Sequence, residues 1–162
     1  MPLRPDVTVA ALAEDGGRFL VVEERIKGRI VFNQPAGHVE LGESLLEAVR
    51  RETLEETAWR FTPQSLLGIY LWQPTAQRRT TLRFAFTGRV HNHDPAQPLD
   101  RGILRTHWLS RPELIERGSR LRSPLVLRCI DDYLAGRSHP LDLVAHLDVE
   151  SAASATGAAI RL

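Results

Sequence analysis

The hydrophobic positions of this chain change their period several times, and each change predicts a different element. Residues 7–14 form an apolar, β-branched run, and residues 19–24 form a second one after a glycine-containing turn at 15–17. Two short runs of this composition on either side of a turn predict a β-hairpin. We therefore expect the chain to open with two paired strands. Residues 25–33, which carry Arg25, Lys27 and Arg29 around Gly28, are expected to follow as a cationic loop.

A helical period begins after residue 44. Apolar or packed positions then recur at the spacing of one helix face: Leu45, Leu46, Val49 and Thr53. Ser44 stands immediately before this run and Glu47 three residues after it, which is the pattern of a capping box. We predict a helix from about Ser44 to Thr57.

The second half of the chain repeats both periods. Residues 65–73 and 80–89 predict two strands; in the second, Leu82, Phe84 and Phe86 alternate with Arg83, Ala85 and Thr87. A polar loop over 91–102 leads to a short strand at 106–109. Helices are predicted over 111–117, capped by Ser110, and from 123 to about 136. Strands, one acidic helix, more strands and terminal helices predict an α+β fold with a mixed sheet between helices.

Length and composition favour one globular domain. The chain has 162 residues, of which 43% are hydrophobic, enough for a sizeable core. We assign that domain to residues 1–147. Residues 148–162 form an Ala/Ser-rich tail that lacks the apolar content to pack by itself.

The charge balance restricts the partners. The formal net charge is +1 and no block of Lys and Arg occurs, so neither a nucleic-acid polymer nor a membrane surface is expected as partner. No apolar run reaches the ~20 residues of a membrane span. The single cysteine, Cys129, lies in a helical apolar stripe and is expected to be an inert core thiol. We expect no signal peptide, a cytoplasmic location, and a monomer or homodimer.

The acidic end of the first helix carries the chemistry. Glu52, Glu55 and Glu56 fall within about one 100° sector of the helix. Like charges at this spacing oppose the helix by about 0.2–0.5 kcal/mol per pair, so a cation should compensate. Converging carboxylates suit a hard divalent ion such as Mg²⁺. Arg51 is placed to orient Glu52, and Glu43 to pair with Arg51.

These residues resemble a known signature. Gly37, five residues, Glu43, seven residues and then Arg51-Glu52-Thr53-Leu54-Glu55-Glu56 resembles the Nudix box of the Nudix hydrolases. The resemblance implies an α/β/α sandwich and cleavage of diphosphate linkages with Mg²⁺ or Mn²⁺. Two positions depart from the pattern: Thr53 replaces an aliphatic residue, and Ala58 stands where glycine normally ends the helix. The helix end is therefore the feature in doubt, because a left-handed residue without glycine costs about 1 kcal/mol.

The resemblance also implies roles. The Gly37 carbonyl, Glu52, Glu55 and Glu56 would hold metal ions, with a further acid such as Asp100 from the 91–102 loop. Glu52 is our candidate for the base that activates water, although it is equally placed to be a ligand. Arg51 and Glu43 would support it. The substrate would be a small phosphoanhydride.

Candidates for substrate binding lie outside the box. The backbone at Gly37-His38 would guide a phosphate; Gln34 precedes it, and Arg29 belongs to the cationic loop. Trp72 and Arg83 would hold an aromatic base by stacking and charge. The simpler interpretation is a solvated loop for Arg29 and a core position for Trp72.

A narrower resemblance extends over residues 5–147. The segments Phe32 to Glu40 and Arg122 to Val126, with Tyr133, are similar to the NudJ-type phosphatases of the Nudix family. This implies release of orthophosphate from nucleoside di- and triphosphates and from hydroxymethylpyrimidine or thiamine diphosphate. The alternatives are a Nudix enzyme that releases pyrophosphate or nucleoside monophosphate, and a non-catalytic nucleotide sensor.

Overall fold

The computed structural model describes residues 2–75 and 79–147. Its strands are β1 (Asp6–Asp15), β2 (Arg18–Ile26), β3 (Arg29–Asn33), β4 (Ala36–His38), β5 (Arg60–Trp72), β6 (Thr81–His91) and β7 (Ile103–Ser110). Its α-helices are α1 (Leu45–Thr57), α2 (Arg111–Arg117) and α3 (Leu125–Leu134), with short 3₁₀ turns at Gly118–Arg120 and Leu141–Leu143. The tail predicted for 148–162 lies outside the described residues.

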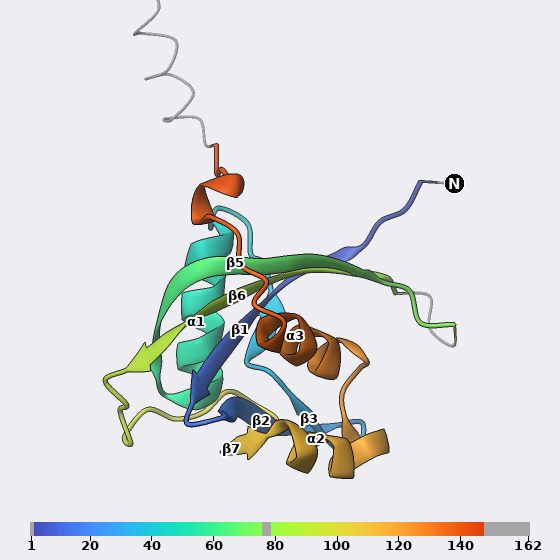
Figure 1. The fold of residues 1–162 in the computed structure, drawn as a ribbon, viewed down its shortest axis with the longest axis vertical. Coiled ribbons are helices and arrows are strands. Elements are labelled where there is room, and N and C mark those ends of the chain that lie inside the picture. The colour runs from blue at the N-terminus through green and yellow to red at the C-terminus, as the bar shows by residue number, and fades with distance from the viewer. Residues whose placement is uncertain (1, 76–78, 148–162) are drawn as a thin grey trace, which may run out of the picture.

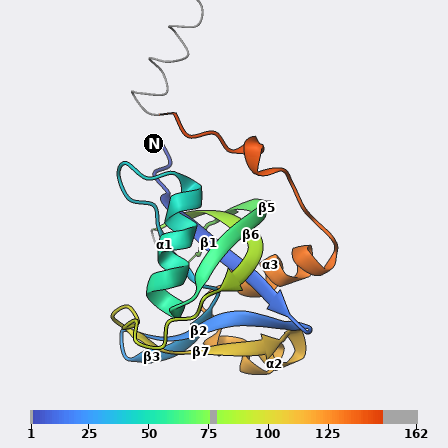
Figure 2. The same cartoon turned by 90° about the vertical axis from the view of Figure 1, so that its left-hand side faces the viewer.

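β1 is the central strand of a mixed sheet. It runs parallel to β6 and antiparallel to β4, and β5 continues the sheet beyond β6. Alternate β1 residues pack in opposite directions: Val9 and Ala11 belong to the core around α1, whereas Ala10 and Leu12 belong to the core around α3. Figures 1 and 2 show α1 and α3 on opposite faces of this sheet. The predicted α+β sandwich with a mixed sheet is therefore confirmed.

The opening hairpin differs from our prediction. β1 and β2 pair only through Glu14 with Phe19 and Asp15 with Arg18. β1 has both edges occupied by β4 and β6, so β2 turns away and pairs with β3 and β7 instead. In Figure 2 these three strands form a second layer, with α2 beneath it. The turn at 15–17 is therefore a corner between two layers.

The prediction of a loop over residues 25–33 is wrong. This segment contains the end of β2, a two-residue turn and all of β3. Lys27 and Gly28 have φ of 47° and 78°, and two consecutive positive φ values are typical of the type I′ turn of a hairpin. Lys-Gly is a weaker hairpin signal than Asn-Gly, so the turn was missed. The three-residue strand β4 was also missed because it is too short to show a period.

The ends of α1 are decided locally. Ser44 and Glu47 form the predicted capping box, with both reciprocal hydrogen bonds present. Thr53 is fully buried, and its hydroxyl donates to the Val49 carbonyl at 2.7 Å, so its polar atom is satisfied within the helix. Ala58 ends the helix in the left-handed conformation, at φ 60° and ψ 10°. The helix thus ends as it would with glycine.

The left-handed conformation at the C-terminal end of α1 predicts different effects on stability for two substitutions of Ala58. Ala58→Gly removes a left-handed strain of about 1 kcal/mol but also a buried methyl worth about 0.8 kcal/mol, because Ala58 is only 2% exposed. We expect it to change the free energy of unfolding by less than about 0.5 kcal/mol. Ala58→Val, which places a β-branched residue at positive φ, should cost about 2 kcal/mol or more. Urea denaturation of both variants checks this, and equal effects would contradict it.

The remaining boundaries shift without changing the architecture. β5 begins at Arg60 instead of residue 65 and contains Pro63, which is tolerated because β5 is an edge strand with irregular register at that point. In α3, Cys129 is fully buried as expected, but Leu134 is 58% exposed. Within the described ranges, every helix is too short or too polar to cross a membrane.

Candidate active site

A cavity of about 500 Å³ opens beside β4. It is lined by residues from α1, from β4, from the strands of both layers and from the loop before β7. Seven of the predicted site residues line it: Gly37, His38, Glu52, Glu56, Trp72, Arg83 and Asp100. The lining is mostly polar and carries both signs of charge, which suits an anionic, hydrogen-bonding ligand.

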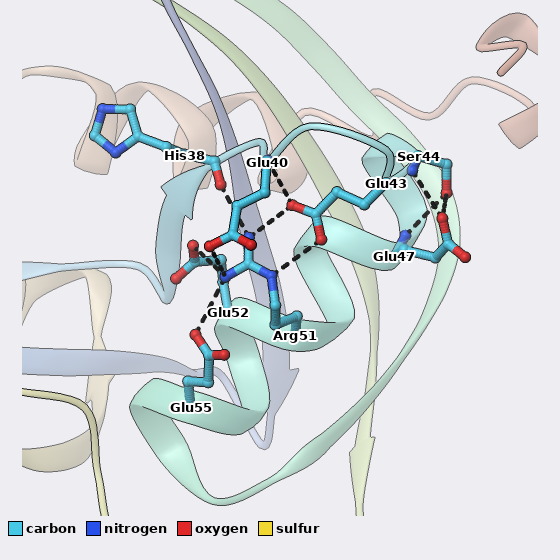
Figure 3. Close-up of polar contacts among 8 residues, drawn as sticks. All are labelled: His38, Glu40, Glu43, Ser44, Glu47, Arg51, Glu52 and Glu55. Atoms are coloured by element: carbon cyan, nitrogen blue, oxygen red, sulfur yellow. Dashed lines mark hydrogen bonds and ion pairs between the residues drawn. The ribbon is translucent and has the colours of Figure 1, made fainter. Parts of the chain in front are cut away.

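Arg51 is the centre of the acidic group (Figure 3). Its Nη2 donates to Glu43 Oε1 at 2.7 Å, and its Nε donates to Glu43 Oε2 at 3.0 Å. Its Nη1 donates to Glu52 Oε1 at 2.9 Å and to Glu55 Oε2 at 3.2 Å. The ion pair expected between Arg51 and Glu43 is thus present and bidentate, which fixes the guanidinium geometrically. Arg51 in turn holds Glu52 in one orientation.

Glu52 and Glu56 are buried carboxyl groups. They are 8% and 7% exposed, and Glu56 Oε2 accepts a hydrogen bond from the Ala36 backbone N–H at 2.9 Å. Burial raises the pKa of Glu56 to about 9, with the charges of Glu24, Glu52 and Asp100 adding to the effect. Burial also raises the pKa of Glu52, although Arg51 opposes it. A carboxylate in such a place is costly unless a cation faces it.

Gly37 leaves the space that Glu52 occupies. A Cβ atom built on Gly37 would lie 2.0 Å from Glu52 Cδ and 2.1 Å from Glu52 Oε1. Because real Cβ contacts do not occur at such distances, any side chain at this position would displace the carboxylate. Glycine here is therefore a requirement of the Glu52 position.

The loop before β7 brings Asp100 to the acids. The Asp100 backbone N–H donates to the Glu55 carbonyl at 2.8 Å, and the Asp94 N–H donates to the Ala58 carbonyl at 3.0 Å. These bonds tie the loop to the C-terminal end of α1. The charge of Asp100 raises the pKa of both Glu52 and Glu56, so its carboxylate lies near theirs. Asp94, another acid in this loop, does not line the cavity.

The acids are the type of ligand that a divalent cation prefers, but their side chains are not arranged as a coordination shell. Across residues 2–75 and 79–147, no three His, Cys, Asp or Glu side chains are grouped closely enough to hold an ion. Arg51 holds Glu52 and Glu55 and supplies their countercharge. The buried Glu56 has no such cationic partner within ion-pair distance among those residues. Oxygen donors with an uncompensated buried carboxylate are the ligand set that Mg²⁺ or Mn²⁺ takes.

Comparison with known proteins identifies the family. The model of the NUDIX domain family matches residues 2–129. The chain belongs to the Nudix family. Its members hydrolyse phosphoric anhydrides, and the Nudix box of this chain is the stretch from Gly37 to Glu56.

Named relatives cover most of the Nudix chain. Phosphatase NudJ of Escherichia coli strain K12 is 40% identical over 141 residues, which are 87% of this chain and 91% of the relative. Phosphatase NudJ of Shigella flexneri has the same identity and coverage. A NUDIX hydrolase from Nitrosomonas europaea is 46% identical with a TM-score of 0.88, covering 90% of this chain and 99% of that one. An ADP-ribose pyrophosphatase from Streptococcus suis, 18% identical with a TM-score of 0.63 over 83% and 94% of the two chains, shares the fold.

Five of the predicted site residues do not line the Nudix cavity: Arg29, Gln34, Glu43, Arg51 and Glu55. Arg29 is exposed at the start of β3 and does not line the cavity. Gln34 is 1% exposed, and its Nε2 donates to the Val126 carbonyl at 2.8 Å, so it joins the sheet to α3. Glu55 has a side chain that is 41% exposed, and it accepts a hydrogen bond from Arg51. His38 lines the cavity, and its carbonyl accepts from Arg51 while its ring points away from Arg51 (Figure 3).

Other cavity residues escaped the sequence analysis. Thr8, Glu24 and Asn33 line the cavity from β1, β2 and β3. The available signal was a polar residue beside an apolar run at each position: Thr8 within 7–14, Glu24 at the end of 19–24, and Asn33 after Val31 and Phe32. Their convergence depends on strand pairing that the pattern of single strands does not show.

Proposed function

We propose that this Nudix hydrolase is a divalent-metal-dependent phosphatase that releases orthophosphate from a diphosphate linkage. The substrates would be nucleoside di- or triphosphates, or hydroxymethylpyrimidine or thiamine diphosphate, and the ion Mg²⁺, with Mn²⁺ as the alternative. A cytoplasmic location belongs to the same proposal. The observation that carries it is the 40% identity to Phosphatase NudJ over 91% of that protein.

The cavity supports this reaction class. A diphosphate is anionic and repels a nucleophile, so its charge must be neutralised before water can attack. Arg83 and Arg122 line the same cavity as Glu52, Glu56 and Asp100. The cations suit the phosphate or the leaving group, and the acids suit an ion and a water molecule. The Gly37-His38 backbone, held against α1 by Arg51, borders the space between them.

The residues of the site have different proposed roles in the reaction. Glu56, Glu52, Glu55, Asp100 and the Gly37 carbonyl are the oxygens that would hold the ion. When bound, the ion supplies charge neutralisation at the phosphate and a more acidic water. Glu52 is our proposed base: burial raises its pKa above the usual range of a glutamate, which makes it a better proton acceptor than an exposed carboxylate. Arg51 keeps that carboxylate oriented, and Glu43 keeps Arg51 in place.

The released product tests the proposal. Each candidate substrate, nucleoside triphosphates above all, is incubated with the protein and Mg²⁺. We expect free orthophosphate and no pyrophosphate, because the terminal anhydride is the bond that is cut. Chelation with EDTA should lower the rate at least about 10²-fold, and excess Mg²⁺ or Mn²⁺ should restore it. Separate enzymatic assays for phosphate and pyrophosphate, run on the same samples, make the measurement.

Two other outcomes would overturn it in different ways. Pyrophosphate from a nucleoside triphosphate, or two monophosphates from a dinucleotide, would identify another Nudix hydrolase. Binding of nucleotides without any release of phosphate would identify a sensor. Glu116→Gln, an exposed acid on α2 outside the cavity, serves as the control and should retain the wild-type rate.

A further inference from the structure

Buried polar atoms without a partner are concentrated in the cavity. Among the residues that the structure describes, five such side-chain atoms occur. Four of them belong to residues that line the cavity: Thr8 Oγ1, Glu24 Oε1, Asn33 Oδ1 and Arg83 Nε. Each unsatisfied buried group costs about 1–3 kcal/mol, and native proteins keep few of them. Four around one cavity therefore point to a ligand that supplies the missing partners.

These four residues come from two layers and lie away from α1. Thr8 and Arg83 are register partners on β1 and β6. Their neighbours Val9 and Phe84 pack in the core around α1, so the alternation of a strand turns Thr8 and Arg83 to the α3 face. On the other layer, Asn33 pairs with Val22, two residues from Glu24, which makes Glu24 and Asn33 diagonal neighbours on one face.

The existing contacts of Arg83 and Glu24 leave hydrogen-bonding capacity for a ligand. Arg83 is only 5% exposed, and the hydrogen bond that its Nη1 donates to Gln34 Oε1 is long at 3.5 Å. Glu24 Oε1 forms an ion pair with Arg122 Nε at 3.7 Å, which is too long for a hydrogen bond and leaves this oxygen free to accept one. Both Arg83 and Glu24 lie in the part of the chain that the structure describes, and no ion pair joins them. A buried guanidinium and a half-buried carboxylate thus line one cavity without a direct contact between them.

The donor and acceptor pattern selects a ligand. A carboxylate oxygen accepts only, the Asn33 oxygen accepts, the Arg83 N–H donates only, and the Thr8 hydroxyl does either. An amino group needs acceptors, and a neighbouring ring nitrogen or carbonyl needs a donor. Trp72 also lines the cavity and offers a face for a flat ring.

We infer that Thr8, Glu24, Asn33 and Arg83 form a specificity site for a heterocycle that carries an amino group next to a ring acceptor, as cytosine does. Glu24 and Asn33 accept from the amino group, and Arg83 and Thr8 donate to the ring nitrogen or carbonyl. The inference rests on the proposed function, because it assigns the non-phosphate part of the same substrate. Uracil is the sharp contrast, since it has the same size but a carbonyl and an N–H at these two positions.

Turnover of cytidine and uridine diphosphates tests the site. We expect kcat/KM for cytidine diphosphate to exceed that for uridine diphosphate by about 30-fold or more, because a wrong edge leaves buried groups unpaired. Glu24→Gln, which presents a donor beside the acceptor, should reduce this ratio to less than about 5-fold. The adjacent Glu23→Gln is the matched control: Glu23 pairs with His107 and Arg105, lies outside the cavity lining, and should leave the ratio unchanged.

A binding measurement separates this inference from the proposed function. Calorimetric titration with cytidine and uridine monophosphates should show the same preference without any hydrolysis. Thr8→Val, which removes the unpaired hydroxyl while keeping its shape, should weaken cytidine monophosphate binding about 5-fold and leave the protein folded, as its melting temperature will show. Equal affinities for cytidine and uridine monophosphates, or no binding of either nucleotide, would contradict the proposed specificity site. Preference without phosphate release would instead leave the site standing and overturn the phosphatase.

Discussion

Replacing Glu56 by glutamine is expected to lower kcat by about 10³-fold while making the metal-free protein more stable at alkaline pH. The activity falls because a neutral amide can neither neutralise nor orient a divalent cation. The stability rises because Glu56 is 7% exposed and, within residues 2–75 and 79–147, its carboxylate accepts only the hydrogen bond from the Ala36 N–H. Ionising this carboxyl inside the protein is unfavourable without a cation.

The pH dependence has a definite sign. The pKa of Glu56 is raised from 4.5 to about 9 in the folded chain. The contribution of this group to stability is therefore complete below pH 4.5 and is lost as the pH rises toward 9. Glutamine has no such loss. With about 1.4 kcal/mol per pKa unit, we expect Glu56→Gln to be more stable than wild type by about 2–4 kcal/mol at pH 8.5.

Urea denaturation in EDTA, at pH 5 and at pH 8.5, measures this effect. The two proteins should differ little at pH 5, and added Mg²⁺ should stabilise only the wild type at pH 8.5. Glu116→Gln, whose carboxyl is exposed, should behave as wild type throughout. A stability difference independent of pH would show that the carboxyl of Glu56 is not strained by burial.

Gly37→Ala is expected to lower kcat about 10²-fold with a much smaller effect on folding, because a displacement of about 1 Å in a catalytic group is sufficient for such a loss. The new methyl would occupy the position of the Glu52 carboxylate, 2.0 Å from its Cδ. The Glu52 carboxylate is at the end of a flexible side chain and can move aside, so the fold is retained. The carboxylate would lose its hydrogen bond from Arg51 and its position in the cavity.

A double-mutant cycle shows whether the loss acts through Glu52. Glu52→Gln alone should lower kcat about 10³-fold, and Gly37→Ala should add little to it, because both remove the same oriented carboxylate. Gly17→Ala controls for destabilisation: Gly17 lies in the corner after β1 at φ 79°, with open space around an added Cβ. It should lose about 1 kcal/mol of stability and keep its kcat. Additive losses in the cycle would place the effect of Gly37 elsewhere.

The helical part of the site could be predicted because its interactions are local. The capping box at Ser44, the order of the acids and the pairing of Arg51 with Glu43 depend on residues at most eight apart. The order of the elements also predicted the α+β fold with a mixed sheet between helices, and the family resemblance implied the α/β/α sandwich. By contrast, β4 has only three residues, and β3 follows a type I′ turn whose Lys27-Gly28 sequence is a weak hairpin signal, so neither strand was detected.

Amino-acid sequence alone determined which carboxylates share one face of α1 and how that helix begins, since helix geometry repeats every few residues. Only the tertiary structure decided which of them are buried, and how far their pKa values move, because burial depends on β4 and the loop that carries Asp100. It also placed Gln34 against α3, left Arg29 outside the cavity, and brought Thr8, Glu24, Asn33 and Arg83 together from four strands. Strand pairing joins residues far apart in the chain, and no local period records it.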